Sequence, residues 1–170
     1  MDGQFKRSLP DLNGYVRKHP QEALRFYELA VAQAFENHGN AIQSLDRALL
    51  LDNGLTQAHY MRAVLKSEEG KPAAAIDDLL PSLDREPRNY HVMVRLGQAY
   101  LALDRAHDAA QVLKRTADQA PDAPSVLTGY VRALEKLGDK EAVRAILARL
   151  KQTGTAVEGP HNVVSDSLII

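Results

Sequence analysis

The chain has 170 residues, of which 45% are hydrophobic and 25% are charged, and its formal net charge is −1. This composition is ordinary for a soluble globular protein, and the balanced charge, with no basic stripe, makes nucleic acid a poor partner. The absence of cysteine excludes disulfides and thiol chemistry, and with no run of about 18 apolar residues no transmembrane helix is expected.

The first nineteen residues are expected to form an extension before the main domain. The polar stretch 1–7 should fray. A short helix is predicted for residues 9–18, where Gly14 costs about 1 kcal/mol relative to alanine, and His19-Pro20 ends it. This helix is expected to cover the start of the domain. The chain begins without the apolar core of a secretion signal. We therefore expect a cytoplasmic protein, and a periplasmic or membrane-associated location stays open in case a signal or anchor was trimmed.

Two pairs of helices are predicted next, over about residues 23–55 and 56–89. The sequence ENHGN at 36–40 predicts the turn of the first pair, and Gly70-Lys71-Pro72 that of the second. Pro72 suits the first turn of a helix. Pro81 falls inside the predicted helix, which it should kink at a cost of about 3 kcal/mol if nothing relieves the strain.

Two further pairs are predicted over about residues 90–123 and 124–152, so that the helical domain spans 20–152. In the third pair, Gly97 has no side chain and lets two helices approach closely, while Leu113 fills the gap between layers. Gly138-Asp139 predicts the last turn.

The pattern stops after Gln152. Residues 153–170 are rich in Gly, Thr, Ser and Pro and end in the apolar Leu168-Ile169-Ile170. Two interpretations stay open for this tail: it is flexible, or its apolar end docks into a groove of this molecule or of a neighbour.

The third pair resembles a tetratricopeptide repeat (TPR). Leu96, Gly97 and Tyr100 in one helix, Ala109 and Leu113 in the next, and prolines 34 residues apart at 87 and 121 follow the pattern of this family. The resemblance implies an all-α protein, a right-handed α-solenoid of about four helix–turn–helix units. An N-terminal half-unit would precede these units and an irregular C-terminal tail would follow them.

The resemblance also implies a binding surface on the concave side, formed by positions two, five, nine and twelve of each first helix. The positions that we single out as a peptide-binding groove are Tyr27, Val31, Gln57, Tyr60, Val64, His91, Val94, Gln98, Leu101, Thr128 and Arg132. The neighbouring positions of this kind are Leu24, Ala34, Ser67, Ser125 and Glu135.

This groove would be apolar and aromatic toward its N-terminal half and polar toward its C-terminal half. An extended or helical peptide with two or three apolar side chains would fit it, with its polar end near Arg132. The alternative is that some of these residues, Tyr27 and Tyr60 included, only pack against the adjacent repeat. The Lys and Asn donors with which some members of the family hold chaperone tails are replaced here by Tyr and Val, so that role is not expected.

No catalytic or metal site is predicted. The six histidines lack the spacing of a helical zinc site, and His59 is expected to fill a large core position. The acidic pairs Glu68-Glu69 and Asp77-Asp78 are expected to be solvated. No phosphate-binding loop or nucleophile elbow occurs. We therefore expect no enzyme and no cofactor.

The leading hypothesis is a protein–protein interaction scaffold that holds a peptide or helix of another protein in its concave groove. One alternative is a scaffold that self-associates through the open solenoid end and residues near Leu168, Ile169 and Ile170. The other is a regulatory TPR domain of a larger enzyme or secretion assembly.

Overall fold

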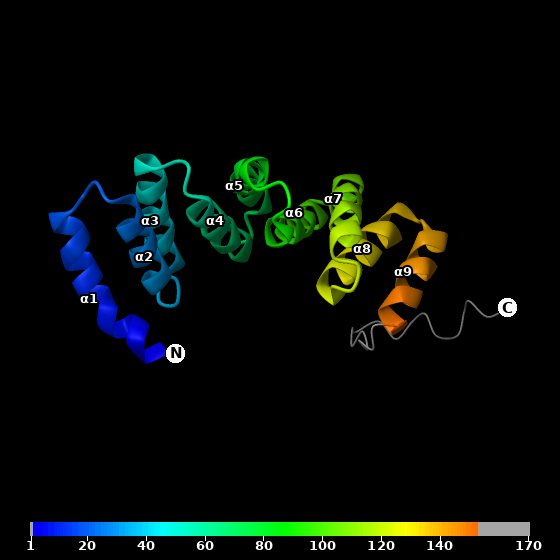
Figure 1. The fold of residues 1–170 in the computed structure, drawn as a ribbon, viewed down its shortest axis with the longest axis horizontal. Coiled ribbons are helices and arrows are strands. Elements are labelled where there is room, and N and C mark those ends of the chain that lie inside the picture. The colour runs from blue at the N-terminus through cyan, green and yellow to red at the C-terminus, as the bar shows by residue number, and fades with distance from the viewer. Residues whose placement is uncertain (1, 153–170) are drawn as a thin grey trace.

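The structure is a computed structural model that describes the backbone of residues 2–152 and the side chains of residues 9–152. Over that range the chain forms nine α-helices and no strands (Figure 1). The helices are α1 (Asp2–Lys18), α2 (Ala23–Gln33), α3 (His38–Leu51), α4 (Thr56–Glu68), α5 (Pro72–Arg85), α6 (Tyr90–Ala102), α7 (Ala106–Gln119), α8 (Pro124–Leu137) and α9 (Lys140–Gln152). The apolar end of the predicted tail lies outside the described residues.

The helices pack as four successive hairpins, which are α2–α3, α4–α5, α6–α7 and α8–α9. Each hairpin contacts the next through α3 and α4, α5 and α6, or α7 and α8, and α1 packs on α2. The hairpins follow one another along the molecule, so that α1 and α9 lie at opposite ends (Figure 1). This is the predicted all-α solenoid, because each hairpin buries its apolar face only against its neighbours.

The repeated small and large core positions explain the stacking. Ala41, Ala75 and Ala109 are fully buried at equivalent places in α3, α5 and α7, and a fully buried leucine follows each of them four residues later. Residues four apart share a helix face, so each alanine allows a close helix approach while its leucine fills the adjacent space.

Gly97 and Leu113 show how close two helices come. A Cβ atom on Gly97 of α6 would lie 2.6 Å from Cγ of Leu113 on α7, a distance that real Cβ atoms do not reach. A Cβ on Gly129 of α8 would lie 3.4 Å from the same leucine. The predicted role of Gly97 is therefore confirmed, and Leu113 fills the space between α6 and α8.

Three local predictions need correction or refinement. The helix α1 begins at Asp2 although residues 1–7 were expected to fray; Gln, Lys and Arg are polar but good helix formers. The helix α3 begins at His38, within the predicted turn, because Asn37 Oδ1 accepts a hydrogen bond from the Asn40 amide at 2.9 Å and caps the helix. The helix α5 continues through Pro81 to Arg85 as one element.

Candidate binding groove

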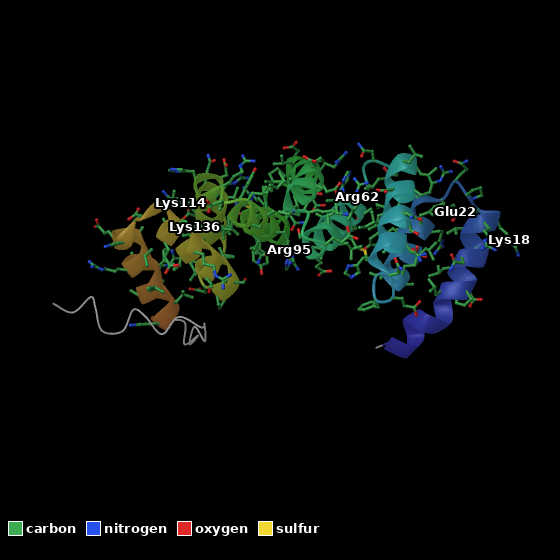
Figure 2. All side chains as sticks on the ribbon, turned by 180° about the vertical axis from the view of Figure 1, so that it is seen from behind. Lys18, Glu22, Arg62, Arg95, Lys114 and Lys136 are labelled. Carbon is green, nitrogen blue, oxygen red and sulfur yellow. The ribbon has the colours of Figure 1, made fainter. Side chains whose placement is uncertain are left out.

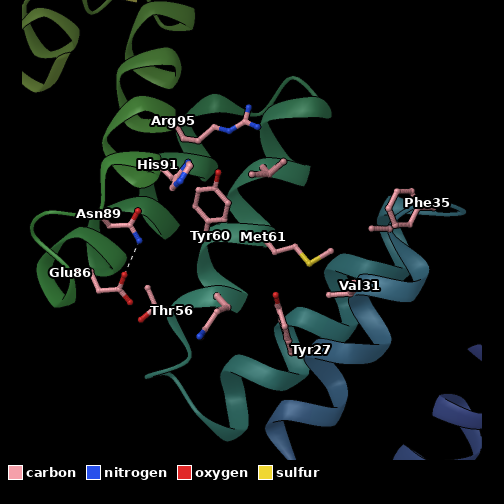
Figure 3. Close-up of a pocket in the computed structure, with 13 residues that line it drawn as sticks. Tyr27, Val31, Phe35, Thr56, Tyr60, Met61, Glu86, Asn89, His91 and Arg95 are labelled. Atoms are coloured by element: carbon pink, nitrogen blue, oxygen red, sulfur yellow. Dashed lines mark hydrogen bonds between the residues drawn. The ribbon is translucent and has the colours of Figure 1, made fainter. Parts of the chain in front are cut away.

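A groove of about 700 Å³ opens between α2, α4 and the beginning of α6 (Figure 3). It opens there because α2 packs against α1 and α3, while α4 packs against α3 and α5. The first two hairpins thus meet mainly through α3 and α4, which leaves the facing sides of α2 and α4 uncovered. We call this space the α2–α4 groove; its lining residues are Tyr27, Val31, Ala34, Phe35, Thr56, Gln57, Tyr60, Met61, Val64, Glu86, Asn89, His91 and Arg95.

The floor of the α2–α4 groove is apolar and aromatic. Tyr27 and Val31 lie four residues apart on α2, and Tyr60 and Val64 lie four apart on α4, so each pair shares one face of its helix. Both tyrosine rings are half-buried and pack against the core from the groove side. Among the described residues, no protein group hydrogen-bonds to either tyrosine hydroxyl. The floor therefore presents fixed aromatic area together with two polar groups that a ligand can use.

The edge of the groove formed by α6 and the loop before it is polar and carries both charges. Glu86 accepts a hydrogen bond from Asn89 Nδ2 at 2.7 Å, while the Asn89 Oδ1 atom caps α6. His91 and Arg95 follow on α6, with Glu86 and Arg95 at opposite ends of this edge (Figure 3). The Arg95 guanidinium donates a long hydrogen bond of 3.5 Å to Gln98.

Six of the eleven predicted groove residues line this space. These are Tyr27, Val31, Gln57, Tyr60, Val64 and His91. The other five do not line it. Val94 packs against the core of the last hairpin and Leu101 against the central core, while Gln98, Thr128 and Arg132 lie farther along the solenoid. The helices α6 and α8 contact each other directly.

The sequence reasoning missed several residues of the groove. Arg95 lies four residues after His91 and so shares its helix face, but the concave positions assigned from the family pattern pass over it. Phe35 lies just beyond α2, and 75% of its surface is exposed at the groove. Met61 follows Tyr60 directly. The four-residue spacing from His91 was the signal that would have identified Arg95.

A second face of α4 takes part in an ion network centred on the buried Asp78 of α5, whose surface is only 2% exposed. Lys66 Nζ lies 2.8 Å from Asp78 Oδ2, Arg62 Nε lies 3.0 Å from the same oxygen, and His59 Nδ1 lies 3.2 Å from Oδ1. Arg62 also reaches Asp46 of α3 at 2.5 Å. We call these five residues the Asp78 network.

The prediction that Asp77-Asp78 is a solvated pair is therefore wrong for Asp78. Adjacent residues on a helix point to different faces, and here Asp77 faces solvent while Asp78 faces α4. Burial opposes ionisation of this carboxyl group, but hydrogen bonds from Arg62 and Lys66 outweigh it and hold the pKa of Asp78 below its ordinary value. The network links α3, α4 and α5, and so fixes the helix whose other face forms the groove floor.

The charged side chains of the described residues are spread along the solenoid. Figure 2 shows nitrogen and oxygen atoms interspersed along the solenoid, with no extended region of one charge on the side that it displays. Among the side chains that the structure describes, no three or more His, Asp and Glu residues are grouped to hold a metal ion. Over residues 2–152, no helix has both the length and the apolar character needed to cross a membrane.

Comparison with known proteins gives the family. A family model described as tetratricopeptide repeat matches residues 66–124 and 104–155. No curated protein sequence matches the chain.

Among solved structures, a crystal structure of MamA protein superposes with a TM-score of 0.83 at 17% identity, covering 89% of this chain and 83% of that one. MamA 41-end from Desulfovibrio magneticus RS-1 gives a TM-score of 0.84 at 14% identity, covering 92% and 89%. At such identities the likeness shows the fold alone. The family match, which spans more than half of the chain, shows that the protein belongs to the tetratricopeptide repeat family.

Proposed function

We propose that this protein is a non-enzymatic interaction scaffold and that the α2–α4 groove holds an apolar segment of a partner protein. The observation that carries the proposal is the pairing of Tyr27 and Val31 with Tyr60 and Val64 across an open space of about 700 Å³. Helices and extended peptides bind proteins by placing two or three apolar side chains in such a groove. Tyrosines suit this role because they offer large contact area at a low cost in conformational entropy.

The position of these side chains favours binding over simple packing. Tyr27, Val31, Tyr60 and Val64 are half-buried and line the groove, while Ala30 of α2 and Ala58 and Ala63 of α4 are fully buried. The floor side chains thus contact the core on one side and leave the other side open to the groove. A partner seated in the groove would contact both of the first two hairpins, which otherwise meet mainly through α3 and α4.

The test is a pull-down with mass spectrometry on the parent chain and on the double variant Tyr27→Ala/Tyr60→Ala. The matched control is Leu50→Ala, because Leu50 is 75% exposed on α3 and does not line the groove. We expect the double variant to lose specific partners that the parent and the control retain, with thermal unfolding showing that all three chains fold. Equal capture by all three would contradict the proposal.

Self-association through Leu168-Ile169-Ile170 stays a prediction, because these residues lie outside the described part of the chain. Light scattering on the full chain and on a chain ending at Gln152 would decide it: a larger mass for the full chain alone supports it, and equal monomeric masses contradict it.

A further inference from the structure

We infer that the α2–α4 groove selects its partner segment by charge and direction: apolar side chains seat between α2 and α4, and an acidic side chain lies against Arg95. This inference rests on the proposed function, since it specifies which peptide the groove would take. The partner is thus a protein segment with an apolar face and a carboxylate at one end.

Arg95 is positioned to receive a carboxylate. It is half-buried on α6, lines the groove, and among the described residues no carboxylate oxygen lies within 4.0 Å of its guanidinium. Arg25 and Arg105 already have such partners, with Glu28 and Asp108 each at 2.7 Å, whereas Arg95 differs from the other unpaired arginines in lining the groove. A guanidinium binds a carboxylate through two parallel hydrogen bonds, and this pairing strengthens where water is partly excluded.

The opposite end of the polar edge carries the opposite charge. Glu86 is held there by Asn89, and Thr56 lies nearby on α4 (Figure 3). Between Glu86 and Arg95 lie His91 and the aromatic ring of Tyr60 (Figure 3). The polar edge of the groove therefore has an anionic end and a cationic end, and the apolar floor lies beside it.

This arrangement favours one direction of the bound segment. A helical segment carries partial positive charge at its N-terminus and partial negative charge at its C-terminus, so its N-terminus would lie toward Glu86 and its acidic side chain toward Arg95. In the reversed direction, the acidic side chain would face Glu86 and the positive N-terminal end of the helix would face Arg95. Such like-charge contacts disfavour the reversed direction and unsuitable partners, and they contribute less to the affinity of the correct segment.

The groove does not have the features of a phosphate site. Phosphate groups are generally recognised by several arginines acting together, whereas Arg95 is the single arginine among the lining residues and Glu86 stands at the same edge. A single guanidinium beside an apolar floor instead matches one carboxylate on an amphipathic segment.

The test uses a display library of random 16-residue peptides, selected on the full chain and on its Arg95→Glu, Arg132→Glu and Tyr60→Ala variants. Arg132→Glu is the matched control, because Arg132 is exposed on α8 and lies outside the groove. We expect the parent and the control to enrich peptides with apolar residues at helical spacing and an Asp or Glu at one side. The Arg95→Glu variant should enrich Lys or Arg at that side instead.

A synthetic peptide from the parent selection then measures the effect. Replacing its acidic residue by the amide should weaken binding to the parent about tenfold, and the Arg95→Glu variant should recover binding when that residue becomes Lys. Apolar peptides without charge preference, or an equal loss in Arg132→Glu, would overturn the inference and leave the proposed function standing. If no peptide is enriched, or if binding does not respond to Tyr60→Ala, the proposed function falls, and this inference with it.

Discussion

At the scale of single residues, Asp78 is the charge on which the placement of α4 depends. Removing it leaves Arg62, Lys66 and His59 facing one another beside α5 without their shared acceptor. Breaking a buried ion pair by deleting one partner is strongly destabilising, so we expect Asp78→Ala to lower the free energy of unfolding by about 3 kcal/mol. Urea unfolding followed by circular dichroism measures the change, with exposed Asp77→Ala as the matched control, expected to stay within about 0.5 kcal/mol of the parent.

The same carboxylate has a predictable pH signature. Because its pKa is lower in the folded chain than in the unfolded one, its contribution is complete above its ordinary value of 3.8 and is lost as the pH falls through the folded pKa. The stability difference between the parent and Asp78→Asn should therefore be constant near neutral pH and shrink only below about pH 4. If this stability difference instead declined between pH 5 and 7, a titrating group other than Asp78 would be its cause.

The residues that could be predicted from the sequence are those whose environment is set within one repeat. Gly97, Ala109 and Leu113 were identified because their roles recur at fixed spacing. Asp78 and Arg95 were not, since their roles depend on what a neighbouring helix presents. The sequence places Asp78 next to Asp77, and only the packed hairpin shows that α4 directs two cations and a histidine at it.

At the scale of elements, the contact between α6 and α7 is set by one missing side chain. We expect Gly97→Ala to destabilise the protein by about 1–2 kcal/mol, because overpacking against Leu113 outweighs the gain in helix propensity. Leu113 has little room to move, since Gly129 of α8 lies on its other side. The control is Gly14→Ala in α1, where a Cβ would meet nothing within 4 Å, and it should stabilise by about 0.5–1 kcal/mol.

A double-mutant cycle separates the clash from a general effect of the substitution. Once Leu113→Ala has removed the clashing atoms, adding Gly97→Ala should cost much less than it does in the parent. Equal costs in both backgrounds would mean that the close contact between α6 and α7 does not limit residue 97.

Element boundaries were predictable where a local signal dominates. Gly138 ends α8 with a φ of 75°, as its predicted turn requires. The start of α3 was misplaced because the signals in ENHGN conflict: its glycine and asparagines suggest a turn, yet the Asn37 side chain caps a helix that already contains Gly39. The capping hydrogen bond decides between the two, and the sequence alone does not show whether it forms.

At the scale of the whole molecule, the repeat pattern predicts four stacked units but not where their inner faces separate. The sequence reasoning spread the groove over all four first helices; the α2–α4 groove is formed by the first two of them and the beginning of the third. The difference comes from the relative placement of successive hairpins, which depends on many small packing contacts and on inter-hairpin pairs such as Arg62 with Asp46.

The same uneven stacking predicts uneven local stability along the solenoid. The central core joins residues of α4 through α8 in one cluster, while the first hairpin contacts the rest of the domain mainly through α3 and α4, and α9 contacts α8. Repeat proteins unfold as coupled neighbouring units rather than as one block. Native-state hydrogen exchange should therefore show the strongest protection in α6 and α7, with α2 and α9 opening at lower free energy.

The Asp46→Ala variant tests this uneven local stability, because it removes the ion pair between Asp46 of α3 and Arg62 of α4. Protection should fall in α2 and α3 and stay unchanged in α6 and α7, since the central cluster does not include Asp46. If instead every helix exchanges with one common free energy in the parent and in the variant, the domain opens as a single cooperative unit. The open space between α2 and α4 would then not weaken the coupling between the first two hairpins.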